Sequence, residues 1–142
     1  MRVQIAVLAQ TVSVDRFTNR VSIFNLIDAI ESPRFPLFIP ELAFFALLRK
    51  ESNDPEQFKV RVSISVGPSI IGSTEVQVDF QGSQNARILL NFQGLPVTEP
   101  KDLHIAVSLP NQQHFASDVM VIQSGQATGS LPFQTEEAKK NS

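Results

Sequence analysis

Residues 35–50, with the sequence FPLFIPELAFFALLRK, are the stretch from which the fold of this chain is best worked out. Its second half, residues 41–50, has neither glycine nor proline and is apolar at most positions. In a strand, successive side chains point to opposite faces. One face would then carry Leu42, Phe44, Ala46 and Leu48, and the other Ala43, Phe45 and Leu47. Because a strand with one wet face alternates apolar with polar residues, this stretch predicts a strand covered on both faces.

The composition excludes several classes of function. The 142 residues include no Cys, so disulfides and thiolate metal sites are absent. The net charge is −2 and basic residues are spread thinly, so we expect no nucleic-acid partner. Residues 5–9 form too short an apolar run for a signal peptide, and no stretch approaches the ~20 apolar residues of a membrane span. We therefore expect a cytoplasmic protein without a membrane partner.

Short alternating segments outside residues 35–50 indicate the fold class. The clearest is residues 58–66, where five apolar side chains from Phe58 to Val66 alternate with polar ones. Further strands are predicted at residues 2–10, 21–30, 74–80, 86–92, 103–109 and 115–122. About eight strands without a long helix predict an all-β fold, an immunoglobulin-like antiparallel sandwich. We expect a domain over residues 1–123 and a flexible C-terminal tail over residues 124–142.

Segments rich in proline, glycine or polar residues are predicted to connect these strands. Residues 11–20 are expected to be a polar connection with a turn at residues 18–20. Residues 33–40 contain three prolines and predict an extended edge segment or a loop. Residues 70–71 are expected in a loop that plugs one end of the core, and residues 93–101 at a corner. Residues 21–30 are apolar on both sides like residues 41–50; a short helix over residues 24–31 is the alternative.

A search for catalytic and ligand-binding residues gives little. His104 and His114, the only histidines, are expected at the surface, and their spacing without Cys is not that of a zinc site. No phosphate-binding glycine motif is present. We therefore expect no enzyme, no cofactor and no metal. The rival hypothesis is a small-ligand-binding protein or hydrolase with carboxylates in a cleft, for which Asp28, Glu31 and Glu41 are the candidates, with His104.

The two segments that are apolar on both sides predict a contact surface. If they were adjacent, Ala43, Phe45 and Leu47 would join one side of residues 21–30. That side would carry either Ile23 and Ile27, with Val21, or Phe24, Leu26 and Ile30. Leaving such a patch exposed to water would forgo several kcal/mol of hydrophobic stabilisation, at about 25 cal/mol for each Å² of apolar surface. Its cover could be residues 33–40, residues 131–133, a second copy of the chain or another protein. We expect a protein-interaction module that forms a homodimer.

Four stretches also carry a family resemblance. They are SIFNLIDAI at residues 22–30, FP at residues 35–36, IPEL at residues 39–42 and NFQGLPVTEPKDLHIAV at residues 91–107. The chain resembles a bacterial family of small single-domain β proteins that is known only as a domain of unknown function. Ser22 and residues 101–103 depart from the family pattern. The resemblance implies a bacterial, intracellular β-sandwich and carries over no catalytic or binding residue.

Overall fold

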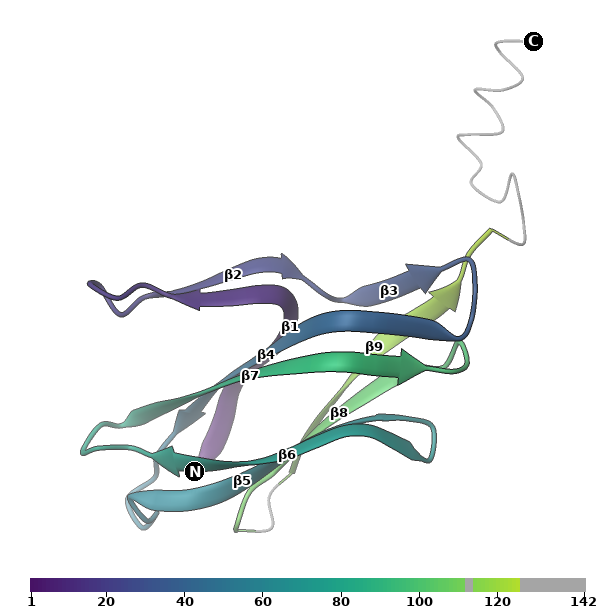
Figure 1. Ribbon diagram of the computed structural model, residues 1–142. Helices are drawn as coiled ribbons and strands as arrows, with labels where there is room; N and C mark the ends of the chain where they lie inside the picture. Colours follow the sequence, from purple (N-terminus) through teal and green to yellow (C-terminus); the bar gives the residue numbers. More distant parts are fainter. Residues whose placement is uncertain (112–113, 126–142) are drawn as a thin grey trace, which may run out of the picture.

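The structure, a computed structural model, describes residues 1–111 and 114–125. All regular elements in this part of the chain are strands, as Figure 1 shows. They are β1 (Arg2–Val14), β2 (Val21–Leu26), β3 (Ala29–Ser32), β4 (Leu37–Arg49), β5 (Gln57–Val66), β6 (Ser69–Asp79), β7 (Asn85–Val97), β8 (Leu103–Ser108) and β9 (His114–Gln123). No helix long and apolar enough to cross a membrane occurs among the described residues. The tail expected from residue 124 lies, from residue 126 on, outside them.

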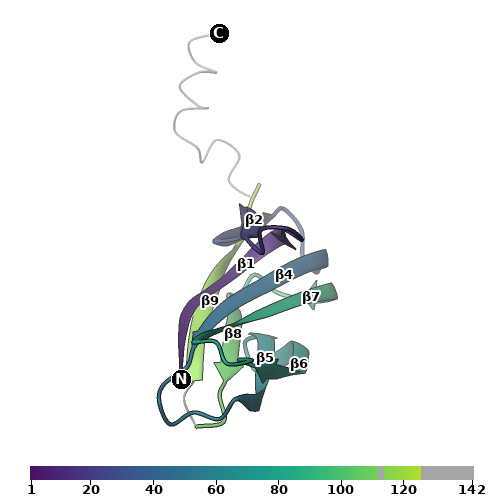
Figure 2. The ribbon, with the colours of Figure 1, turned by 90° about the vertical axis from the view of Figure 1, so that its left-hand side faces the viewer.

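The strands form two sheets that pack on each other (Figures 1 and 2). One sheet has the order β2-β1-β4-β7, and the other has the order β3-β9-β8-β5-β6. All neighbouring pairs are antiparallel except β3 and β9, which run parallel. The prediction of an all-β fold of two sheets is confirmed, with nine strands described in place of about eight.

The core fills the space between the sheets. Phe58, Val60, Val62, Ile64 and Val66 on β5 are all buried, which confirms the alternation predicted for residues 58–66. Phe44 and Phe80 are the largest fully buried side chains, and the Phe58 and Phe80 rings lie 5.5 Å apart between centroids. Phenylalanine carries no polar group that would need a partner, so these rings fill the core without an unsatisfied donor.

The segment predicted as one strand over residues 21–30 is two strands in different sheets. β2 ends at Leu26 and pairs with β1, whereas β3 begins at Ala29 and pairs with β9. Asn25 has a φ of +55°, and the Ile27 N–H donates to the Leu8 carbonyl at 2.8 Å, so the chain leaves the first sheet here. A single strand therefore does not continue, and the alternative helix over residues 24–31 does not form.

Residues 33–40 are wrongly predicted to be a separate edge segment or loop, because residues 37–40 belong to β4 and pair with β7. The Phe35-Pro36 peptide bond just before β4 is cis. Pro40 lies opposite Gly94, where no backbone donor from Pro40 is needed. Leu37 and Ile39 face the core before this point, whereas Leu42 and Phe44 face it afterwards. The strand thus changes its inward face at Pro40 and stays in register.

Three further connections are shorter than predicted. β1 continues to Val14, and the turn after it is held by Asp15, whose Oδ1 accepts N–H hydrogen bonds from Phe17 at 2.8 Å and Thr18 at 2.7 Å. The residues predicted as a loop at 70–71 lie in β6; Ile70 is 69% exposed and only Ile71 packs on the core. The corner predicted at residues 93–101 starts later, because β7 runs to Val97. The longer β7 follows from the Leu95 and Val97 side chains, which reach the core.

The two long sides of the sandwich differ. On one side β6 approaches β7 so closely that a Cβ added to Gly72 would lie 3.1 Å from the Phe92 and Leu95 side chains. On the opposite side β1 and β9 run alongside each other without pairing, as Figure 2 shows. The sandwich is therefore tight at β6 and β7 and open at β1 and β9.

Candidate functional site

The predicted two-sided strand is β4, and both of its faces are dry. Leu42, Phe44, Ala46 and Leu48 belong to the core. On the other face Ala43 is fully buried, Phe45 is 6% exposed and Leu47 is half-buried, yet none of the three is part of that core. Their cross-strand neighbours surround them. Phe45 lies between Val7 and Leu89, and Ala43 lies between Ala9 and Asn91. Neighbours within the sheet therefore cover much of this face.

Large apolar side chains on the neighbouring strands extend this surface to the solvent. Ile5 on β1 lies opposite Leu47 and is 46% exposed, and Leu89 on β7 is 39% exposed. On β2, Phe24 and Leu26 are 52% and 59% exposed. Leu26 lies opposite Ala9, so the two β2 residues share the face of Phe45. We call this surface the outer face; it comprises Ile5, Val7, Phe24, Leu26, Phe45, Leu47 and Leu89.

The structure divides the residues predicted for the interface. Ala43, Phe45 and Leu47 lie on the outer face. Ile23 lies on the opposite face of β2, beside Val12, and Ile27 packs on the core in the link between β2 and β3. The two strands are also not adjacent, because β1 lies between β2 and β4. Two alternatives were predicted for residues 21–30. The set with Phe24 and Leu26 is the one on the same face of the sheet as Phe45, although Ile30 of that set faces the core.

Sequence reasoning missed Ile5 and Leu89 as members of the outer face. Leu89 carried a signal, because it is the one apolar residue at an outward position of residues 86–92. Ile5 carried none, because the register of β1 shifts between Val3 and Ile5 and places the two on different faces. Residues 33–40, predicted as a possible lid, contribute to β4 itself. Residues 131–133, the other possible lid, lie outside the described residues.

A cleft at the open side is the second candidate site. Its volume is about 230 Å³, and β1, β9 and the link between β2 and β3 line it. Leu8, Phe44, Ile105, Phe115 and Val119 are among its apolar walls. Asp28, Ser117 and Asp118 are the polar residues that line it, and all three are exposed. This cleft is an apolar slot with few polar groups.

The residues proposed for carboxylate chemistry do not converge. Asp28 lines the cleft, whereas Glu31 on β3 and Glu41 on β4 do not. His104 lies in a pair across β8 and β9, with its Nδ1 2.7 Å from Asp118 Oδ1, and both side chains are largely exposed. No group of three potential metal ligands occurs in the part of the chain that the structure describes. The described residues therefore place one of the four candidates, Asp28, at the cleft.

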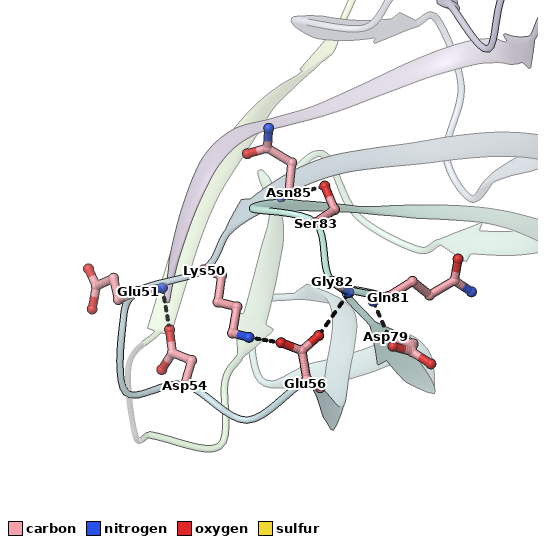
Figure 3. Close-up of polar contacts among 9 residues, drawn as sticks. All are labelled: Lys50, Glu51, Asp54, Glu56, Asp79, Gln81, Gly82, Ser83 and Asn85. Atoms are coloured by element: carbon pink, nitrogen blue, oxygen red, sulfur yellow. Dashed lines mark hydrogen bonds and ion pairs between the residues drawn. The ribbon is translucent and has the colours of Figure 1, made fainter.

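Polar contacts gather at the end of the sandwich where the β4–β5 and β6–β7 turns meet (Figure 3). Glu56 pairs with Lys50 and accepts a hydrogen bond from the Gly82 N–H at 3.1 Å. Asp54 accepts from the Glu51 N–H at 2.8 Å and pairs with the amino group of Met1, whose side chain is buried. These contacts join two turns and the first residue, which is a structural role.

Burial and charge shift two pKa values in this group. Burial favours the neutral form of Asp54, but the ammonium of Met1 and the Glu51 N–H outweigh it and lower the pKa of Asp54. Burial also lowers the pKa of the Met1 ammonium, but hydrogen bonds to Asp54 and Glu51 outweigh it and raise that pKa. Each partner therefore stabilises the charged form of the other.

Comparison with known proteins adds a family. The model of a family of unknown function, DUF6941, matches residues 4–122. The chain belongs to this family. Searches of curated proteins and of solved structures find no significant match. The resemblance to a domain of unknown function is thus confirmed, and DUF6941 assigns no activity to the outer face or the cleft.

Proposed function

We propose that this DUF6941 protein is a non-enzymatic interaction module that forms a homodimer through the outer face of its four-stranded sheet. The observation that carries the proposal is the set of apolar side chains on one face of the sheet, which extends from Phe24 and Leu26 on β2 to Leu89 on β7 and includes Ile5 and Phe45. Four large side chains, each at least 39% exposed, present several hundred Å², which is the size of a functional patch on a monomer.

The composition of this surface favours a second copy of the chain. A patch on one protomer meets the same patch on another when the two copies are related by a two-fold axis. The centre of the outer face is apolar, whereas Arg87 and Asn91 on β7 lie at its border. An apolar centre with a polar rim is the usual anatomy of an interface. We further propose that the scaffold is an immunoglobulin-like sandwich and that it acts in the bacterial cytoplasm.

The competing function, a carboxylate hydrolase or a ligand-binding protein, draws its support from Asp28 at the cleft. Two acids that share a reaction must lie on either side of a substrate. Asp118 is a second carboxylate at the cleft, but it pairs with His104, whereas Glu31 and Glu41 lie elsewhere. Because Asp28 and Asp118 are both exposed, we give preference to the interaction module.

Leu89→Glu tests the homodimer. Leu89 is exposed, so a glutamate there leaves the core intact but places a charge in the proposed contact. Phe45→Glu would be a poorer test, because Phe45 is buried and the variant would unfold. Light scattering should give a dimer for the wild-type chain and a monomer for Leu89→Glu.

Ile70→Glu is the matched control, because Ile70 is 69% exposed on β6 in the other sheet. It should remain a dimer. If Leu89→Glu keeps the mass of the wild-type dimer, the outer face is not the contact and the proposal fails.

A further inference from the structure

Two half-strands border the open side of the sandwich, and among the described residues their outer edges have no strand partner. β1 pairs with β2 only from Ala9 onward, so residues 2–7 have a strand partner on one side only, β4. β9 pairs with β3 only from Met120 onward, so residues 114–119 pair on one side only, with β8. Such edges present backbone N–H and C=O groups that another strand can bind.

The two edges run in the same direction along one groove. Arg2 and Val3 line a hollow of about 280 Å³ with His114 and Phe115. The adjoining cleft of about 230 Å³ also contains Phe115 and is lined by residues 6–8 of β1 and residues 117–119 of β9. The two strands therefore run in the same direction along the groove. Figure 2 shows β1 and β9 side by side.

The two edges are too far apart to pair directly with each other. Cα atoms of β1 and β9 lie almost everywhere more than 8 Å apart, which is too far for direct pairing. Neighbouring strands lie about 4.8 Å apart, so a strand between two others needs about 10 Å. An antiparallel strand could pair with both edges, because β1 and β9 run in the same direction.

The side chains of the groove indicate what such a strand would carry. Leu8, Phe44, Ile105, Phe115 and Val119 form apolar walls, so every second residue of the strand should be apolar. Asp28 and Asp118 line the cleft at one end of the groove, and Arg2 and His114 line the hollow at the other. A strand antiparallel to β1 begins at the Asp28 end and finishes at the Arg2 end.

We propose that this groove binds an extended segment of a partner protein by strand addition to β1 and β9. The segment has about six residues, alternates apolar with polar side chains, begins with Lys or Arg beside Asp28 and ends with Asp or Glu beside Arg2 and His114. Strand addition supplies backbone hydrogen bonds for affinity, and the alternate side chains supply specificity.

The heptapeptide Lys-Val-Thr-Val-Thr-Val-Glu is a suitable probe, titrated to about 1 mM so that weak binding is detected. Binding should slow the amide hydrogen exchange of residues 2–7 and 114–119, measured by NMR. The reversed peptide Glu-Val-Thr-Val-Thr-Val-Lys has the same core with exchanged charges and should bind about tenfold more weakly. Replacing the central Val of the probe by Pro removes a backbone donor and should weaken binding by about tenfold or more.

Ser117→Phe should abolish binding, because Ser117 lines the cleft and a ring there fills it. Ala116→Phe is the control, because Ala116 lies on the other face of β9 and should leave binding unchanged. The assay is repeated with Leu89→Glu, in which the outer face is disrupted; binding should persist there, whatever the mass of the wild-type chain. The proposal is overturned if no exchange rate changes, if the Pro peptide binds equally well, or if the amides of β2 are protected instead.

Discussion

At the scale of single residues, the charges around Asp54 make the stability of the protein depend on pH. Folding lowers the pKa of Asp54 from its ordinary value of 3.8. The contribution of Asp54 to the free energy of unfolding is therefore complete above pH 3.8 and is lost as the pH falls through the pKa of the folded state. The pKa of the Met1 ammonium is raised, so its contribution is complete below 8.0 and is lost as the pH rises through the folded value. Stability should therefore be highest between these two limits.

Asp54→Asn tests this dependence. The variant should lose about 1.5 kcal/mol of unfolding free energy near pH 6, the lower end of what a hydrogen bond to a charged group contributes. It should also lose stability less steeply than the wild type below pH 4. Urea unfolding followed by circular dichroism across the pH range measures both. Glu99→Gln is the control, because it removes only the exposed ion pair with Lys101 and should leave the unfolding free energy almost unchanged. If the Asp54→Asn variant lost stability below pH 4 as steeply as the wild type, the role given to Asp54 would be contradicted.

At the scale of elements, alternation predicted the strands with one wet face and was less informative elsewhere. Residues 58–66 and 103–109 were predicted within one residue at each end, because a large apolar side chain occupies every second position there. The division of residues 21–30 was not predictable, because it depends on a positive φ at Asn25 and on which sheet each half joins. The prolines of residues 33–40 misled the prediction, since a strand tolerates Pro40 where the partner strand has Gly94.

Gly94 is the residue on which this part of the sheet depends. Its φ is +69°, and a Cβ added there would lie 3.2 Å from the Phe38 ring. Gly94→Ala should cost about 1–2 kcal/mol, mainly because side chains disfavour this conformation. Gly94→Asn should cost less, because Asn tolerates it.

Urea unfolding of the two Gly94 variants distinguishes backbone strain from crowding. Gly82→Ala is the control, because Gly82 has a φ of +76° and no atom within 4 Å of an added Cβ. It should lose about as much stability as Gly94→Ala, since the exposed Phe38 ring can move aside. A Gly94→Asn variant less stable than Gly94→Ala would show that crowding decides.

At the scale of the whole molecule, the sequence predicted a surface and the fold determined its members. The dry second face of residues 41–50 was readable, because Ala43, Phe45 and Leu47 interrupt the polar alternation of an exposed strand. Ile5 and Leu89 join that face only through the order β2-β1-β4-β7 and its register. The open side between β1 and β9 also results from topology, since it exists because β2 and β3 pair with only half of each neighbour.

The mass of the wild-type chain in solution tests the central claim most directly. Sedimentation velocity over a range of concentrations from about 1 μM to about 100 μM covers contacts of moderate affinity. If the outer face joins two copies, the mass should rise with concentration toward twice the 15.7 kDa of a single chain. A mass that stays at 15.7 kDa over the whole range would contradict a homodimer.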